Sequence, residues 1–394
     1  MRKAAPWAHM NARRTVRERG LVETLRRILE LSPIVDLIKQ LEYINRTGRP
    51  ARYRPRTMVA LAVARVLFRA PCWTNLLELL AEHSELRQAC HIGANEATPS
   101  PNACYKLTAK LRELGLLEEC AHALVDLIAA RVPGFGRIIA LDATDIETYG
   151  NARRDPPSDG DARWGVRHTG NGDGTEAYMG YKLHLMVDAD CQIPIGWKLT
   201  PANASDGDHA VPILEAARSR APWLKPEFAI MDKGYDTVDV CRRLEEEHGC
   251  HPVIPQRQRG HGNRDGLDPK GRPCCEKGVW TWKGTDYANR RTKWACPYEE
   301  DSRVHSVAGC RGPGKGRRRW LSWRQNPRRH KLIPEGTRKF KTLYAKRVSV
   351  EREFSLLKDG FLLDSHRARA LDGVDTHVHL CLVVRLAVAV LSLR

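Results

Sequence analysis

Two short apolar runs that each end on an aspartate constrain the fold of this chain more than any other feature. Residues 138–141 lead into Asp142, and residues 228–231 lead into Asp232. An acidic residue at the carboxyl end of a buried strand is where an open α/β sheet presents its ligands. On neighbouring strands the two carboxylates would repel each other and need a cation between them, and their hard oxygens suit Mg²⁺ or Mn²⁺. Taken singly, each aspartate is better interpreted as a turn cap.

The residues around these runs predict an α/β fold. Strands interleaved with helices indicate a sheet with helices packed on its faces. Strand patterns occupy 137–150, 180–190, 193–206 and 251–256, a helical pattern occupies 209–221, and 227–249 has the pattern of a strand, a turn and a helix. Helical periodicity returns at Phe340 and continues, with a break around Gly360, to the end. We therefore expect residues 134–394 to form one α/β domain.

The first 133 residues are predicted to form a separate helical domain for DNA binding or oligomerisation. Apolar residues recur at helical spacing within 13–48 and 57–89. Thr98 or Ser100 is suited to cap a helix that begins near Pro101. Short helices joined by tight turns are typical of a helix-turn-helix DNA reader, with Ser100 to Arg112 as a candidate recognition helix. They are equally typical of a plain helical bundle.

Positive charge is concentrated in one stretch of the chain. The formal net charge is +18, and residues 256–347 contain 25 Lys and Arg against 8 Asp and Glu, a net charge of +17. This distribution indicates a polyanionic partner such as nucleic acid. Residues 256–340 lack sustained periodicity, and we interpret them as a basic insertion within the α/β domain.

The insertion also contains residue types that bind metals or bases. Six of its residues have side chains of the kind that binds zinc: Cys274, Cys275, Cys296, Cys310, His261 and His305. Because no Cys-x₂₋₄-Cys knuckle is present among them, zinc is not expected. Its tryptophans either stack on bases of unpaired DNA ends or pack a small subdomain, and the sequence favours neither: Trp280, Trp282, Trp294, Trp320 and Trp323.

Four polar residues near the C-terminus align on one predicted helix face. Tyr344, Arg347, Glu351 and Lys358 fall within a stripe roughly 60° wide at 100° per residue. An ordinary ion pair between Arg347 and Glu351 would leave the aligned Tyr344 and Lys358 unexplained. A metal ligand flanked by groups that bind DNA phosphates explains all four.

The spacing Y-(2)-R-(3)-E-(6)-K of these four residues resembles the signature of a large group of bacterial insertion-sequence DDE transposases. The chain is also similar to this group at 140–147, 180–190, 200–210 and 231–236, in the expected order. The resemblance covers roughly residues 50–259 and 340–394.

The resemblance implies an α/β ribonuclease-H-like catalytic domain behind an all-α, helix-turn-helix-like N-terminal domain, with the basic insertion before the last catalytic helix. Asp142, Asp232 and Glu351 would be the catalytic residues and the ligands of two Mg²⁺ or Mn²⁺ ions, and Tyr344, Arg347 and Lys358 would bind DNA phosphates. The implied reactions are DNA cleavage and strand transfer, on transposon ends and target DNA, by a dimer or larger assembly. One alternative is a related metal-dependent nuclease without strand transfer. The other is a DNA-binding relic of a transposase that has lost catalysis, and the presence of all three acids and both cations argues against this second alternative.

Several acidic residues compete with these assignments. Asp145 and Glu147 stand close to Asp142, but strand alternation would place Asp142 and Asp145 on opposite faces if the strand continues that far. Glu353 lies about 160° from the stripe on the helical wheel. Finally, Asp206 and Asp208 are interpreted as caps of the helix that follows them.

The ends of the chain indicate a cytosolic protein. The N-terminus is basic but lacks the apolar core of a signal peptide. The scattered cysteines are typical of reduced thiols. The apolar run at 380–393 is interrupted by Arg385, and we expect it to be a buried helix that is too short to span a membrane.

Overall fold

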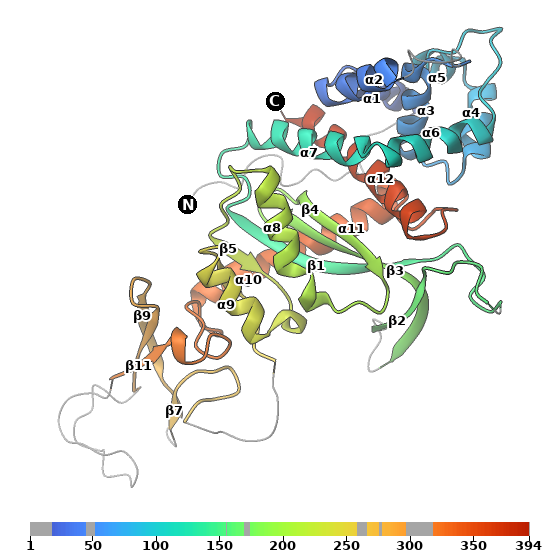
Figure 1. Cartoon of the computed structure of the whole chain (residues 1–394). Coiled ribbons are helices and arrows are strands. Elements are labelled where there is room, and N and C mark those ends of the chain that lie inside the picture. Colours follow the sequence, from blue (N-terminus) through green and yellow to red (C-terminus); the bar gives the residue numbers. More distant parts are fainter. Residues whose placement is uncertain are drawn as a thin grey trace, which may run out of the picture. The chain divides into compact units, whose positions relative to one another are not determined.

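The computed structural model describes residues 18–44, 52–154, 156–168, 174–257, 266–275, 278–296 and 318–393. The chain divides into two compact units. Unit 1 combines Met1–Phe135, Ala143–Ala204 and Ser349–Arg394, and unit 2 combines Gly136–Asp142 and Ser205–Val348. Strand β1 (Ile138–Glu147) contributes its first residues to unit 2 and its remaining residues to unit 1 (Figure 1).

The N-terminal part of unit 1 is helical, as expected. Its helices are α1 (Glu18–Leu29), α2 (Ser32–Ile44), α3 (Pro55–Leu67), α4 (Trp73–Glu82), α5 (Ser84–Ala89), α6 (Pro101–Glu113) and α7 (Leu116–Ala129). The predicted cap of α6 is confirmed, because Ser100 Oγ accepts a hydrogen bond from the backbone N–H of Ala103 at 3.3 Å. The buried residues of α1 recur three or four apart, as on one face of a helix: Val22, Leu25, Ile28 and Leu29.

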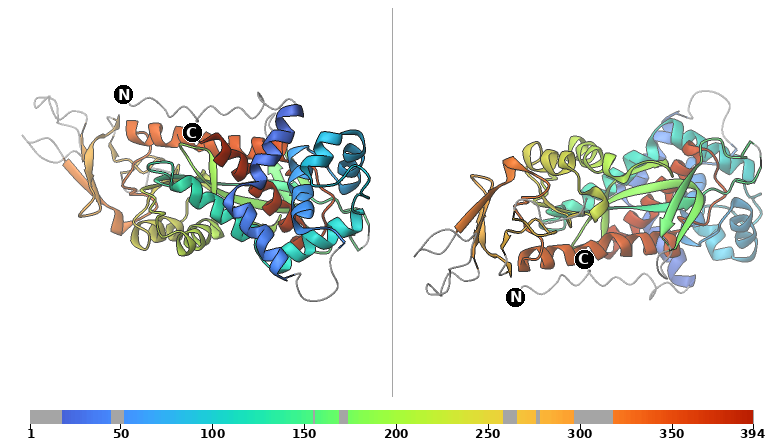
Figure 2. Two further views of the ribbon diagram at one scale, coloured as in Figure 1. Left: turned by 90° about the horizontal axis from the view of Figure 1, so that it is seen from above. Right: turned by 90° about the horizontal axis from the view of Figure 1, so that it is seen from below.

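The last helix of the chain forms the core of this helical part. Helix α12 (Leu371–Ser392) packs against α1, α3, α6 and α7, and Figure 2 shows it passing among them. It has 22 residues and is apolar enough to cross a membrane by length and composition, so the expectation that it is too short is wrong. However, 83% of its most apolar window is buried inside the protein, as expected for a core helix.

Unit 1 also contains the antiparallel part of the sheet. Strand β3 (Thr175–Asp188) pairs with β4 (Ile193–Pro201) in the predicted hairpin. The carboxylate of Asp188 holds the hairpin turn by accepting N–H groups of Asp190 and Cys191 at 2.9 and 2.6 Å. The beginning of β3 pairs with β2 (Arg163–His168), a strand that the sequence pattern does not predict. Helix α11 (Val348–Phe361) completes the unit.

Unit 2 contains the parallel part of the sheet. The first residues of β1 pair with β5 (Phe228–Ile230), and β5 pairs with β6 (His251–Val253), both in parallel. Helices α8 (Ala210–Arg220) and α9 (Val238–Glu246) connect these strands and contact each other. The mixed sheet with its helices confirms the α/β class. Strand β1 continues beyond Asp142 to Glu147, within the strand pattern expected over residues 137–150.

The basic insertion contains a small sheet of its own. Strands β9 (Thr281–Asp286), β10 (Arg291–Ala295) and β11 (Arg318–Ser322) form it, and β7 (Cys274–Cys275) pairs with β8 (Gly278–Val279). Its core consists of Leu267, Trp294 and Leu321, against which Trp280 and Trp282 pack. Helix α10 (Arg338–Tyr344) follows the insertion.

Candidate active site

The two aspartates that end the apolar runs come together in unit 2. Ile138, Ile139 and Ala140 of β1 are paired with Phe228, Ala229 and Ile230 of β5. The paired residues end at Ala140 and Ile230, so Asp142 and Asp232 each follow the pairing by two residues. Adjacent strands lie roughly 4.8 Å apart, so two carboxylates meet at this edge of the parallel strands.

The turn after β5 fixes the carboxylate of Asp232. Its Oδ1 accepts the backbone N–H of Gly234 at 2.7 Å, which makes Asp232 the N-cap of the 3₁₀ turn η4 (Lys233–Tyr235). A Cβ atom on Gly234 would lie 2.9 Å from that same oxygen, a closer approach than real Cβ atoms make. Residue 234 must therefore be glycine if the carboxylate is to keep this position. The expected turn cap is present, and the cap leaves Oδ2 of Asp232 for another partner.

A buried phenol lies beside the aspartates. Tyr235 is 2% exposed, and burial raises its pKa well above the ordinary value, with further increases from Asp142, Asp206 and Asp232. The three carboxylates therefore lie close enough to Tyr235 to disfavour its ionised form.

Asp206 is a residue that the sequence analysis misjudged. Asp206 and Asp208 do not cap α8 with their side chains: they form the 3₁₀ turn η3 (Asp206–Asp208), and His209 is the N-cap of α8 without a side-chain hydrogen bond. Turn η3 contacts η4. Asp206 is also one of the carboxylates that raise the pKa of Tyr235.

A cation from the end of unit 2 neutralises the first aspartate. Arg347 Nη1 lies 2.8 Å from Asp142 Oδ2, in an ion pair whose side chains are about three-quarters buried. Tyr344 stacks on Phe340 with ring centroids 5.5 Å apart. Burial raises the pKa of Tyr344, Arg347 lowers it, and Asp232 and Asp142 raise it. Asp142, Asp232, Tyr344 and Arg347 are thus one cluster.

The predicted helix that would align four residues is not continuous. Tyr344 ends α10, Arg347 lies in the 3₁₀ turn η6 (Ala345–Arg347), and only Glu351 and Lys358 belong to α11. The wheel based on 100° per residue therefore does not hold across 344–347. Tyr344 and Arg347 belong to unit 2, whereas Glu351 and Lys358 belong to unit 1.

Lys358 contacts carboxylates of its own unit. Its Nζ donates to the Asp145 carbonyl at 2.8 Å and lies 3.1 Å from Asp364 Oδ2. The guanidinium of Arg167 binds Asp145 at 2.7 Å and Glu147 at 2.6 Å. Cations of unit 1 thus bind both of the acids that compete with Asp142. Strand β1 does continue through Asp145, so the alternation of side chains along it directs Asp142 and Asp145 to opposite faces.

The two glutamates of α11 have different environments. Glu351 is exposed in the first turn. Glu353 is 1% exposed, and its carboxylate accepts from Arg385 Nη2 at 2.9 Å. Burial raises the pKa of Glu353 to about 7, against the opposing effect of Arg385. Glu353 is therefore part of the core of unit 1.

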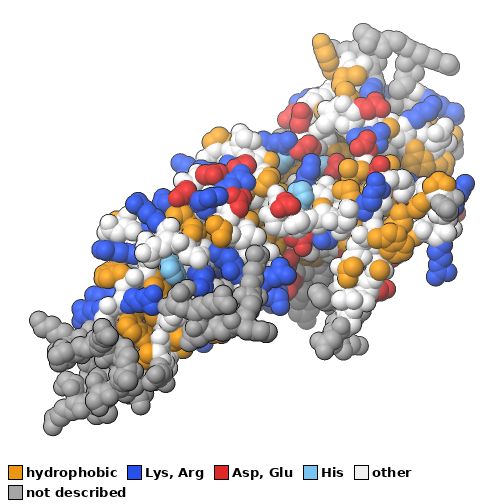
Figure 3. All heavy atoms as spheres, turned by 60° about the horizontal axis from the view of Figure 1, so that its bottom comes forward, with side chains coloured by type: hydrophobic (Ala, Val, Ile, Leu, Met, Phe, Trp, Pro, Cys, Tyr) orange, Lys and Arg blue, Asp and Glu red, His pale blue; other side chains and the backbone are white. Residues whose placement is uncertain are grey.

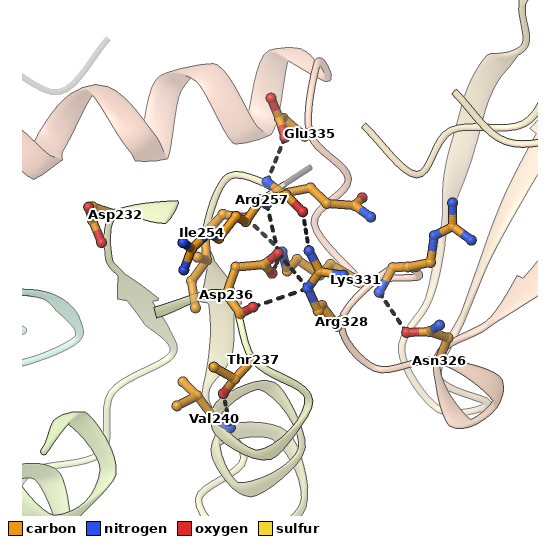
Figure 4. Close-up of polar contacts among 12 residues, drawn as sticks. Asp232, Asp236, Thr237, Val240, Ile254, Arg257, Asn326, Arg328, Lys331 and Glu335 are labelled. Atoms are coloured by element: carbon orange, nitrogen blue, oxygen red, sulfur yellow. Dashed lines mark hydrogen bonds and ion pairs between the residues drawn. The ribbon is translucent and has the colours of Figure 1, made fainter. Parts of the chain in front are cut away.

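A buried ion cluster lies four residues after Asp232 (Figure 4). Asp236 is fully buried, with Lys331 Nζ 2.5 Å from Oδ1 and Arg328 Nε 2.7 Å from Oδ2. Asp236 also accepts the backbone N–H of Arg257 at 2.8 Å, and Lys331 donates to the carbonyl of Ile254 at 2.9 Å. The cluster ties the end of the insertion to the segment that carries Asp232, and the sequence analysis did not find it.

Another group of possible metal ligands occurs in unit 2. Within the described residues, three such side chains come within 4.8 Å of one another at Glu215, Glu247 and His248. Arg243 already binds Glu215 at 2.7 Å and Glu247 at 3.2 Å, and Arg218 bonds to His248 at 2.9 Å. Because arginines neutralise this group, we do not assign it a metal ion.

The insertion presents cations and one tryptophan on its surface. Lys and Arg side chains are dense over it in Figure 3, whereas Asp and Glu are sparse. Trp294 and Trp323 are buried and pack the subdomain, while Trp320 is 43% exposed, with the Arg291 guanidinium 4.2 Å from its ring centroid. His261, His305 and Cys310 of the candidate zinc set lie outside the described residues. The eleven described cysteines are free thiols.

The chain is similar to known transposases. The sequence model of the family described as "Transposase DDE domain" matches residues 133–387. A solved structure of a piggyBac transposase synaptic complex with hairpin DNA is similar at a TM-score of 0.42 and 10% sequence identity, over 92% of this chain and 73% of that one. No curated protein matches the chain. The family match covers well over half of the residues, and the chain therefore belongs to the DDE transposase domain family.

Proposed function

We propose that this protein is an insertion-sequence transposase that cleaves DNA at transposon ends and joins the ends to target DNA. The observation that carries the proposal is the pairing of β1 with β5 directly before Asp142 and Asp232, with Arg347 bound to Asp142. A transposase needs adjacent carboxylates and cations that bind phosphates, and this cluster contains both. The ribonuclease-H-like assignment of the α/β domain belongs to the same proposal.

The residues fit divalent metal ions of the hard class. Asp142 and Asp232 offer oxygen donors, and the potential they create with Asp206 at Tyr235 favours a cation. Asp142, Asp232 and Glu351 would hold two Mg²⁺ or Mn²⁺ ions. When bound, the ions would supply Lewis acidity towards the scissile phosphodiester.

The cations and the phenol have separate tasks in this proposal. Arg347 would transfer part of its contact from Asp142 to a DNA phosphate, because a guanidinium can bind both in a planar fork. Lys358 would bind a second phosphate in place of its contact with Asp364. Tyr344 would donate a hydrogen bond from its hydroxyl or stack on a base.

The remaining assignments concern partners and location. We propose that the helices within residues 1–133 bind DNA or mediate assembly, with α6 as the candidate recognition helix. The net charge of +18 supports a DNA partner. A dimer or larger assembly on DNA, a cytosolic location and the absence of structural zinc complete the proposal.

The test is a cleavage assay on supercoiled DNA that carries the element ends, with Mg²⁺ or Mn²⁺. We expect nicking at the ends by the wild type and its loss in Asp142→Asn and Glu351→Gln, with DNA binding retained. Glu246→Gln, at a partly exposed carboxylate of α9, is the matched control and should cut normally. Cleavage without joined products would indicate a nuclease, and binding without cleavage by the wild type would indicate a catalytically inactive relic. Normal cutting by Glu351→Gln would refute its assignment as a ligand.

A further inference from the structure

A cationic cavity lies within unit 1, apart from the cluster described above. It has a volume of about 240 Å³, far more than the ~30 Å³ that one water occupies in the liquid. Helices α3, α4 and α6, the beginning of α12 and the segment before α12 line it. The lining includes Arg65, Arg112, Arg367 and Arg369, and none of the described residues that line it is Asp or Glu.

Arg65 carries a buried charge at this cavity. It is 9% exposed, and burial lowers the pKa of its guanidinium. Its Nη2 bonds to His377 Nδ1 at 2.8 Å, and its guanidinium lies 5.2 Å from the ring centroid of Trp73. Its buried Nε has no hydrogen-bond partner, and in the described part of the chain the groups that act on the pKa of Arg65 are thiols and a phenol rather than carboxylates. A buried cation without a counter-ion costs several kcal/mol, which an anion in the cavity would offset.

The histidine behind Arg65 is held neutral. His377 Nε2 lies 2.9 Å from the carbonyl oxygen of Leu362, to which it donates, so Nδ1 is free to accept from Arg65. Burial lowers the pKa of His377 well below its ordinary value, and Arg65 lowers it further. His377 therefore orients Arg65 without neutralising its charge.

The other three arginines are exposed around the cavity. The guanidinium groups of Arg367 and Arg369 lie 5.9 and 5.5 Å from the ring centroid of Tyr149. Asp159 and Asp161 lie beside the segment before α12, but they accept the backbone N–H groups of Ala370 and Leu371 at 3.2 and 3.0 Å rather than an arginine of the cavity. The four cations are therefore available for one external anion.

We propose that this cavity binds a phosphate group of a DNA strand, with Arg65 as the buried contact and Arg112, Arg367 and Arg369 around its opening. Guanidinium groups match the oxygens of a phosphate in geometry and charge. Helix α6 contributes Tyr105 and Arg112 to the lining, and it is the helix proposed above to read DNA. The inference that the phosphate belongs to DNA rests on the proposed function, whereas the inference of an anion site does not. A free phosphate or mononucleotide would present the same chemistry.

The first experiment tests the anion site without DNA. Thermal unfolding of the full-length protein is measured in inorganic phosphate and in chloride at equal ionic strength. We expect phosphate to raise the Tm of the wild type, and Arg65→Met and Arg369→Gln to reduce or abolish the increase. Arg131→Gln, an exposed arginine at the end of α7, is the matched control and should keep it. Equal Tm values of the wild type in both salts would overturn the proposal, as would an undiminished increase in both variants.

The second experiment distinguishes the source of the phosphate. The affinity for a short DNA duplex is measured against salt concentration, and deoxyadenosine monophosphate is tested in the thermal assay. We expect Arg65→Met and Arg369→Gln to lower the slope of log affinity against log salt by about 1 each, while Arg131→Gln leaves it unchanged. An unchanged slope in both variants, with DNA still bound, would overturn the DNA assignment and leave the proposed transposase function standing. A wild type that binds no DNA would instead refute the proposed function.

Discussion

Replacement of Asp236 by Asn tests whether the buried ion cluster holds the insertion on the α/β fold. Asp236 is fully buried, and the charge of Lys331, which is 5% exposed, lies 2.5 Å from its Oδ1. Asn would still accept the N–H of Arg257, but two buried cations would lose their counter-charge. Removing one partner of a buried ion pair costs about 3–5 kcal/mol. We therefore expect Asp236→Asn to lower the free energy of unfolding by about 3 kcal/mol or more in urea titrations at pH 7.

The control lies three residues further along the chain. Asp239 has a side chain that is 61% exposed and pairs with Arg242 at 3.1 Å, so Asp239→Asn should cost about 0–1 kcal/mol. Adding Lys331→Met to Asp236→Asn should restore part of the loss, because it removes one of the uncompensated charges. If Asp236→Asn costs no more than Asp239→Asn, the cluster does not stabilise the fold and the reasoning is refuted.

Three further predictions concern the site, the core of unit 1 and the insertion. Gly234→Ala should reduce metal-dependent DNA cleavage roughly 100-fold, because the alanine Cβ would displace the Asp232 carboxylate. The circular dichroism spectrum should stay unchanged, and normal cleavage by the variant would contradict the prediction. Burial raises the pKa of Glu353 from its ordinary 4.5 to about 7, so the folded protein binds the extra proton and stability falls as pH rises between these values. In unfolding titrations, Glu353→Gln should remove this part of the decrease in stability with pH. Parallel stability–pH profiles of the wild type and the variant would refute this role of Glu353. Trp294→Ala should cost about 3–5 kcal/mol in the insertion and expose it to limited proteolysis, whereas unchanged cleavage by protease would show that Trp294 is not a core residue.

Local patterns in the sequence were sufficient for much of the fold. The apolar run before Asp232 ends one residue after β5, and its first three residues are buried in a row, as in a strand shielded on both faces. The apolar run before Asp142 marks only the buried half of β1, which continues as a half-buried strand through polar residues. Strand β2 was missed because its apolar residues Trp164 and Val166 are exposed, so it lacks the buried apolar run by which other strands were identified.

Long-range ion pairs could not be predicted from the sequence. The partners of Asp236 lie 92 and 95 residues further along the chain, beyond any periodicity. Helical spacing grouped Arg347 and Lys358 with Glu351, but it could not reveal that Arg347 pairs with Asp142 or that Lys358 contacts Asp145, because both contacts depend on the path of β1. Which charged side chains form ion pairs with each other depends on the fold of the chain and not on local sequence.

The packing of the last helix among the first ones has a consequence during protein synthesis. Ribosomes add roughly 5–20 residues per second, so a chain of 394 residues takes roughly 20–80 s to complete. Throughout most of that time α3 and α6 exist without α12, and the apolar residues that they bury against it stay exposed. The cavity beside Arg65 also lacks one wall until His377 has left the ribosome. A chain truncated before α12 should therefore be a substrate for chaperones and proteases, and only a chain synthesised beyond Leu380 would have this cavity.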